Sequence, residues 1–234
     1  MKKKGALRLL IGIALLPACI GATQAVLNAA GAVTRSSSSF SMASIALFCG
    51  YLIWIALWIL LPRPARSYVL AHELTHAVVA LLCGADVSRI KVTENGGYVS
   101  LSKSNIWITL SPYFFPFYTF LVVTGYLITA LFITPVPWKP LWYFLIGFTW
   151  SYHTCFTLNS LLIHQPDIKV YGRVFSYVFI YLLNLIVIAL WLVATTPTET
   201  RTLAASFLAH TCSTYALIAE GCAALLRKTS VWLR

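Results

Sequence analysis

The residues best suited to chemistry in this chain form one short cluster, His72-Glu73-Leu74-Thr75-His76. The two histidines are four positions apart, so on a helix they share one face, where two imidazole nitrogens can bind the same metal ion. Glu73 is offset by one residue, which lets its carboxylate reach a metal-activated water without ligating the metal. Zinc lowers the pKa of such a water to about 7, so an adjacent carboxylate can remove its proton. The cluster predicts one Zn2+ per chain, with His72 and His76 as metal ligands and Glu73 as general base.

A third ligand must come from elsewhere in the sequence. Asp167 follows an apolar run, and Pro166 ends the preceding helix, so this carboxylate can turn back toward the metal. An aspartate also halves the charge that two neutral histidines leave on zinc, which reduces the desolvation penalty in a dry site. We predict Asp167 as the third metal ligand, with His153 and His164 as rivals. A histidine in an apolar segment is also compatible with a purely structural role.

The composition places this chemistry in a membrane. Of the 234 residues, 59% are hydrophobic and only 10% are charged, whereas soluble domains carry about 25% charged residues. The net charge of +11 comes from basic residues that lie mostly between apolar runs, as topology signals and lipid anchors do. We therefore predict an integral, multi-pass membrane protein that contacts the lipid bilayer and binds no nucleic acid.

Seven apolar stretches predict the helices, at about 9–33, 44–62, 67–84, 105–134, 138–164, 173–195 and 203–226. The expected fold is an all-α polytopic membrane protein with about six or seven apolar helices. Pro112 and Pro116 predict a kinked or broken helix in the fourth stretch. The stretch 67–84, which holds the histidines, is short and close to Arg63 and Arg66, so we expect it to be re-entrant or tilted.

Residues 86–101 have a different pattern, because apolar and polar residues alternate on either side of Asn95-Gly96-Gly97. This pattern predicts a short, membrane-associated β-hairpin. A substrate helix must unwind before its backbone is cut, and its freed backbone groups then need hydrogen-bonding partners. The edge of a hairpin supplies such partners, so Gly96 and Gly97 are candidate substrate-binding residues.

The distribution of Lys and Arg predicts the orientation. Two predicted spans separate the hairpin from Asp167, so both should face one side of the membrane. That side carries more basic residues, including Arg89, Lys91, Lys103, Lys169 and Arg173. By the positive-inside rule, the active site is expected toward the cytoplasm.

The histidine motif in an apolar helix, the glycine-containing hairpin and the distant aspartate together resemble the site-2 protease family of intramembrane zinc metalloproteases, peptidase family M50. The second signature of that family has an Asn followed eight residues later by an Asp-Gly pair, and Asn159 and Asp167 have this spacing here. Ile168 replaces the expected Gly, and Leu162 stands where Pro is common. The resemblance covers about 67–185 and implies a small, divergent member.

The resemblance also implies the roles of individual residues. It gives His72, His76 and Asp167 as zinc ligands, Glu73 as general base, and Asn159 as a polar residue near the scissile peptide. The activity it implies is hydrolysis of peptide bonds in transmembrane or membrane-associated protein substrates. The expected organisation is 1–66 as N-terminal membrane segments and a loop, 67–185 as the metalloprotease core, and 186–234 as a C-terminal membrane segment and tail.

Two other functions remain open at this point. One is a non-catalytic metal-binding adaptor or chaperone in the membrane, although Glu73 would have no use in a structural site. The other is a transporter for metal or small solutes, although the other predicted spans contain few acidic residues to line a path.

Overall fold

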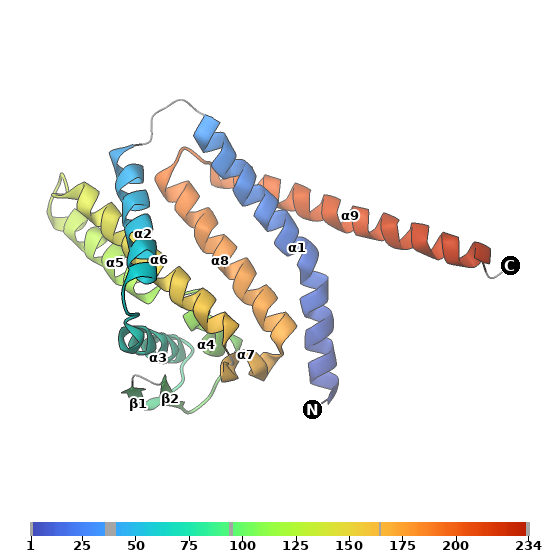
Figure 1. The fold of residues 1–234 in the computed structure, drawn as a ribbon, viewed down its shortest axis with the longest axis horizontal. Coiled ribbons are helices and arrows are strands. Elements are labelled where there is room, and N and C mark those ends of the chain that lie inside the picture. The colour runs from blue at the N-terminus through green and yellow to red at the C-terminus, as the bar shows by residue number, and fades with distance from the viewer. Residues whose placement is uncertain (1, 36–40, 94–95, 164, 233–234) are drawn as a thin grey trace. The chain divides into compact units, whose positions relative to one another are not determined.

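The computed structural model describes residues 2–35, 41–93, 96–163 and 165–232. The chain is mostly helical, with about 80% of its residues in helices and one small two-stranded sheet (Figure 1). It divides into two compact units, one made of 1–38 with 171–234 and the other of 39–170. The prediction of a largely helical protein with one hairpin is confirmed.

The first unit consists of three long helices, α1 (Lys2–Arg35), α8 (Arg173–Thr195) and α9 (Thr200–Trp232). Helix α1 packs against both α8 and α9. Small residues allow this close packing, because a side chain at Gly12 would collide with the backbone of Phe175. A polar contact also joins α1 to α9, where Asn28 Nδ2 and His210 Nε2 are 2.9 Å apart.

The second unit contains three helices that run roughly side by side, here called the upright helices: α2 (Met42–Leu60), α5 (Phe117–Phe132) and α6 (Lys139–Leu162). The longest packing interface joins α2 and α6. Two glycines bring the backbones together, because a Cβ at Gly50 would collide with the carbonyl oxygen of Phe144, and one at Gly147 with that of Leu47. Aromatic residues then fill the space beside them, with Trp54, Tyr152 and Phe156 as the buried core.

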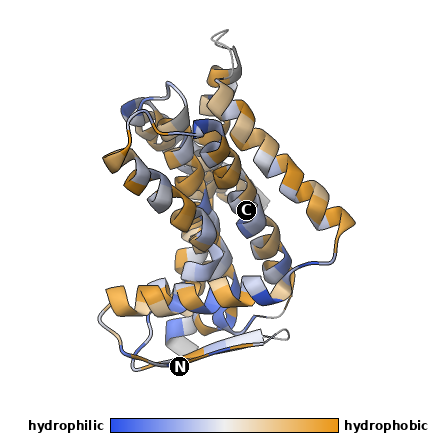
Figure 2. Ribbon diagram, turned by 90° about the vertical axis from the view of Figure 1, so that its left-hand side faces the viewer, coloured by the Kyte–Doolittle hydropathy of each residue, from blue (hydrophilic) through white to orange (hydrophobic). Residues whose placement is uncertain are grey.

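Other elements of the same unit lie across the ends of the upright helices. Helix α3 runs crosswise to α2, and is seen nearly end-on in Figure 1 and along its length in Figure 2. The chain from α4 into η1 meets α5 at a bend of 85°, so the break predicted from Pro112 and Pro116 is confirmed. We call these elements the crosswise layer: α3 (Ala65–Leu82), α4 (Ile106–Leu110) and η1 (Ser111–Tyr113).

The predicted hairpin is present as β1 (Val87–Thr93) and β2 (Gly96–Leu101). The strands are antiparallel, with Lys91 opposite Tyr98 and Val92 opposite Gly97. Both strands pack against α3. Glu94 and Asn95, which belong to the predicted turn, lie outside the described residues.

The unit boundaries differ from the three segments expected from the sequence. Helix α2 packs along α6 and therefore belongs with the motif helix, although it precedes the expected core of 67–185. Residues 171–185 belong with α1 instead, because α8 packs along α1.

Within the described residues, four helices are long and apolar enough to cross a membrane: α1, α2, α8 and α9. The bent pair formed by α4–η1 and α5 raises this number to five if it counts as one span. These long apolar helices are compatible with a membrane protein, but six or seven apolar spans are not confirmed. The difference lies in α3 and α6, where polar residues such as His72, His76 and Asn159 interrupt the apolar character.

Candidate metal centre

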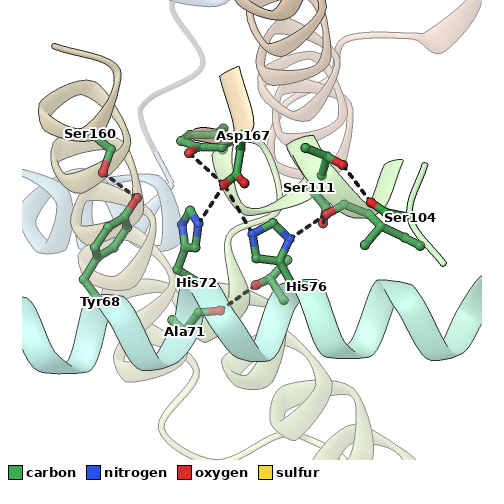
Figure 3. A network of polar contacts seen from close by, with 12 residues as sticks. Tyr68, Ala71, His72, His76, Ser104, Ser111, Ser160 and Asp167 are labelled. Atoms are coloured by element: carbon green, nitrogen blue, oxygen red, sulfur yellow. Dashed lines mark hydrogen bonds and ion pairs between the residues drawn. The ribbon is translucent and has the colours of Figure 1, made fainter. Parts of the chain in front are cut away.

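Helix α3 sets the spacing of the two motif histidines. It begins after Pro62-Arg63-Pro64 and ends just before Gly84, whose φ of +68° suits a residue without a side chain. Along this uninterrupted helix, His72 and His76 lie one turn apart and rise together toward Asp167 (Figure 3). The helix thus presents two imidazoles to one point in space.

Asp167 lies in α7 (Pro166–Tyr171), directly after the proline that begins the helix. Its Oδ2 is 3.4 Å from His72 Nε2 and 3.4 Å from His76 Nε2. The ligand atoms of all three residues lie within 4.8 Å of one another. Residues 91 and 95 positions apart in the chain therefore converge on one point.

The two nitrogen–oxygen distances are compatible with a bound metal ion such as zinc. Bonds of about 2.0–2.1 Å in a tetrahedral site put neighbouring ligand atoms about 3.3 Å apart, close to the 3.4 Å between each Nε2 and Oδ2. His76 Nδ1 donates a hydrogen bond to the carbonyl oxygen of Ile108 over 2.7 Å. Because a carbonyl oxygen can only accept, Nδ1 carries a proton, and Nε2 is the ring nitrogen that would bind a metal when the ring is neutral.

The electrostatics of the cluster favour a cation. Burial by itself raises the pKa of Asp167, but hydrogen bonds to His72 and His76 outweigh it and hold that pKa well below its usual range. Burial lowers the pKa of His72. Burial also opposes protonation of His76, yet its hydrogen bond to Asp167 and the charge of that carboxylate raise its pKa overall. An ionised carboxylate therefore lies between two imidazoles, and a metal ion that binds there would take the place of a proton on His76.

Tyr113 is a member of the site that the sequence reasoning missed. Its hydroxyl donates a hydrogen bond to Asp167 Oδ2 over 3.2 Å, and its ring packs edge-on against the ring of His72. The side chain is fully buried. The available signal was indirect, since Pro112 and Pro116 predicted a break in the helix but not which residue the break would bring to the candidate ligands.

Glu73 lies against the hairpin. A Cβ at Gly97 would be 2.7 Å from Glu73 Cγ and 2.7 Å from the carbonyl oxygen of Lys91, so β2 approaches the glutamate this closely only because residue 97 is glycine. Burial raises the pKa of Glu73, the charge of Asp167 raises it further, and His76 opposes the shift. A raised carboxylate pKa suits a group that must accept and then release a proton.

A cavity of about 790 Å³ adjoins these residues. Its wall includes the three candidate ligands, Glu73 and the other predicted site residues, Asn159, Gly96 and Gly97. Arg63, which the sequence did not predict as a site residue, donates a hydrogen bond from Nη1 to Asn159 Oδ1 over 3.1 Å. The guanidinium of Arg63 in turn lies over the ring of Trp58, at 4.4 Å from its centre. The hydrogen bond from Arg63, which itself packs on Trp58, thus fixes the orientation of the Asn159 amide.

The rival ligands are placed differently. His153 is buried in α6, and its Nε2 lies 3.5 Å from Oγ1 of Thr157 on the same helix. Among the described residues, the group of three side chains that could hold a metal ion consists of His72, His76 and Asp167, without His153. His164 lies outside the described residues, so its candidacy remains untested.

Comparisons of the chain with family models, with curated proteins and with solved structures found no match. The geometry therefore carries the functional argument. It joins three candidate zinc ligands, a buried carboxylate beside them, a strand and an oriented amide around one cavity. This combination is suited to hydrolysis of an extended peptide.

Proposed function

We propose that this chain is an intramembrane zinc metalloprotease of the site-2 protease type, which cuts peptide bonds of membrane proteins. The observation that carries the proposal is the convergence of His72 Nε2 and His76 Nε2 on one oxygen of Asp167, each at 3.4 Å. When bound, zinc would polarise the scissile carbonyl and acidify a water molecule.

In this proposal His72, His76 and Asp167 bind the metal, and hydrogen bonds with neighbouring groups keep two of these ligands in position. The Ile108 carbonyl fixes the tautomer of His76, and the Tyr113 hydroxyl restrains the carboxylate of Asp167. Such outer contacts orient ligands and commonly change metal affinity by about 10–100-fold when they are removed.

Glu73 acts as the general base. Its carboxylate takes a proton from the attacking water and then passes that proton to the nitrogen of the leaving amine. The close contact with Gly97 limits where this carboxylate can move. A non-catalytic adaptor would have no use for an acid held in this position.

Strand β2 and Asn159 receive the substrate. One edge of β2 pairs with β1 in the two-stranded sheet, and several β2 residues line the cavity. An extended substrate segment can add to the other edge through backbone hydrogen bonds. Asn159 Oδ1 accepts from Arg63, so the amide nitrogen is the group turned to donate to a substrate carbonyl. The excess of Lys and Arg on the hairpin side supports a cytoplasmic orientation.

A direct test measures metal and activity on the same preparation. The purified chain in detergent should contain one zinc and cut a single-span peptide. A strong chelator should abolish cleavage, and added zinc should restore it. Zinc without cleavage of any membrane peptide would support the adaptor, and zinc uptake into vesicles would support the transporter. A chain that binds no zinc would refute the metalloprotease.

A further inference from the structure

Helix α3 has an apolar face that the metal site does not use. The residues on this face recur at helical spacing: Leu70, Leu74, Val78 and Leu81. They are offset by two positions from His72 and His76, which places them on the side of the helix away from the site. Leu81 is 60% exposed and the adjacent Leu82 is 82% exposed. We call Leu70, Leu74, Val78 and Leu81 the outer face of α3.

The length of α2 indicates the depth at which this outer face lies. Helix α2 has 19 residues, or about 28 Å at 1.5 Å per residue, and the hydrocarbon core of a bilayer is about 30 Å thick. An α2 that crosses the core therefore ends at its boundary. Helix α3 starts at Ala65, shortly after α2 ends at Leu60, and runs crosswise (Figure 2).

Hydrogen bonds to α5 and α6 also place the start of α3 at the level where the upright helices end. The hydroxyl of Tyr118, near the start of α5, donates to the backbone carbonyl of Ser67 over 2.8 Å. The hydroxyls of Tyr68 and Ser160, the latter near the end of α6, are 2.8 Å apart. The first turn of α3 thus touches the ends of α5 and α6 as well as following α2.

The side chains around α3 match the chemistry of a membrane surface. Arg63 and Arg66 are exposed at its start, and Arg63 lies over the ring of Trp58 at the end of α2. Exposed basic residues also mark the hairpin side: Arg89, Lys91 and Lys103. Asp86 is an exposed acid on that side. Tryptophan and basic residues together are typical of the boundary between lipid chains and anionic headgroups.

We propose that the outer face of α3 lies in the polar–apolar boundary of an anionic bilayer. If the proposed protease function holds, on which this second part rests, the substrate is a peptide bond at the end of a membrane span rather than at its middle. The end of a span frays more readily than its centre, and water is present there for hydrolysis.

Depth can be measured without activity. Single spin labels at Val78, at Ile53 in the middle of α2 and at Lys91 in β1 are introduced in full-length chains whose six native cysteines are alanine. In phosphatidylcholine–phosphatidylglycerol vesicles, the ratio of oxygen to nickel-complex collisions should be highest at Ile53, intermediate at Val78 and lowest at Lys91. A value at Val78 equal to that at Ile53, or to that at Lys91, overturns the inference.

A second copy of the chain is the competing occupant of the outer face. Spin–spin broadening at Val78 that disappears when labelled chain is diluted with unlabelled chain would assign the face to self-association and overturn the lipid contact. Unchanged line shapes on dilution support it.

The substrate class is tested with wild-type chain and single-span peptides in the same vesicles. Mass spectrometry of the products should place the cut within about one helical turn of the end of the span, and a cut near its middle overturns the assignment. If no peptide is cut, the proposed protease function fails, while the collision data still decide where α3 lies.

Discussion

In the second unit, the packing among the upright helices differs from the packing of the crosswise layer. Helices α2 and α6 meet backbone to backbone at Gly50 and Gly147, with aromatic rings filling the remaining space. The crosswise layer has a smaller apolar cluster around Ala80 and Ile108 and adds buried polar contacts, such as that of His76 with the Ile108 carbonyl. Substitutions of the glycines between α2 and α6 should therefore change stability, whereas substitutions of the polar side chains around the candidate metal site should mainly change its chemistry.

The largest effect is expected from Glu73→Gln, which removes the base and keeps the shape of the side chain. Cleavage should fall by about 10²–10⁴-fold, the usual contribution of general acid–base catalysis. Zinc content and the melting temperature should stay at the wild-type values, because Glu73 is not a proposed ligand. Steady-state cleavage rates and metal analysis on one preparation test this, and a variant that cuts normally contradicts the mechanism.

Asp167→Ala should weaken zinc binding itself, because it removes a proposed ligand and leaves only the two histidines to bind the ion. Both zinc occupancy and activity should drop, while the chain remains folded. His153→Ala is the matched control, since it changes a buried histidine outside the group of three. Competition with a chelating dye measures both affinities. Loss of zinc from the His153 variant alone would reverse the assignment.

Gly147→Ala tests the packing of the upright helices α2 and α6. Its methyl group would collide with the Leu47 carbonyl, and overpacking of this kind typically lowers the free energy of unfolding by about 1–3 kcal/mol. Gly125→Ala in α5 is the control, because the added methyl meets the ring of Trp142 at an ordinary 3.4 Å. Zinc affinity of the folded fraction should be unchanged in both. Equal melting temperatures for the two variants would contradict the role of Gly147 in packing α2 against α6.

The smallest effect is expected from Tyr113→Phe, which keeps the ring against His72 and removes the hydrogen bond to Asp167. Zinc affinity should fall by about 10-fold, near the lower end of the loss expected when a hydrogen bond to a metal ligand is removed. Tyr118→Phe also loses one hydroxyl contact, to the Ser67 carbonyl, but should leave zinc affinity at the wild-type value. An equal loss in both variants would mean a general effect on folding.

Local spacing explains how much of this arrangement could be predicted from the sequence. The helical period relates His72 to His76, and the alternation around Gly96 and Gly97 predicted the hairpin, because both are short-range properties. Tyr113 and Arg63 were missed, since their partners Asp167 and Asn159 are distant in the chain and only the folded structure brings them together.

Four or five described helices or bent pairs are apolar and long enough to be spans, and the six or seven apolar helices expected are not confirmed. Apolar length alone does not separate a helix that crosses a bilayer from one that is apolar on one side. Helix α3 carries leucines on its outer face and the candidate metal ligands on the other, and it runs crosswise to α2, in agreement with the expectation of a re-entrant or tilted segment.

The glycine contacts between α2 and α6 have a consequence for the lipids around the protein. Helices whose backbones interlock at Gly50 and Gly147 cannot slide past one another, so the pair adjusts to a bilayer of different thickness mainly by tilting together. Because α3 follows α2 after a short, proline-containing turn, that tilt also inclines α3 and moves the candidate site relative to the headgroups. In the proposed protease, acyl-chain length would thereby influence which peptide bond reaches Glu73, without a lipid binding at any specific point.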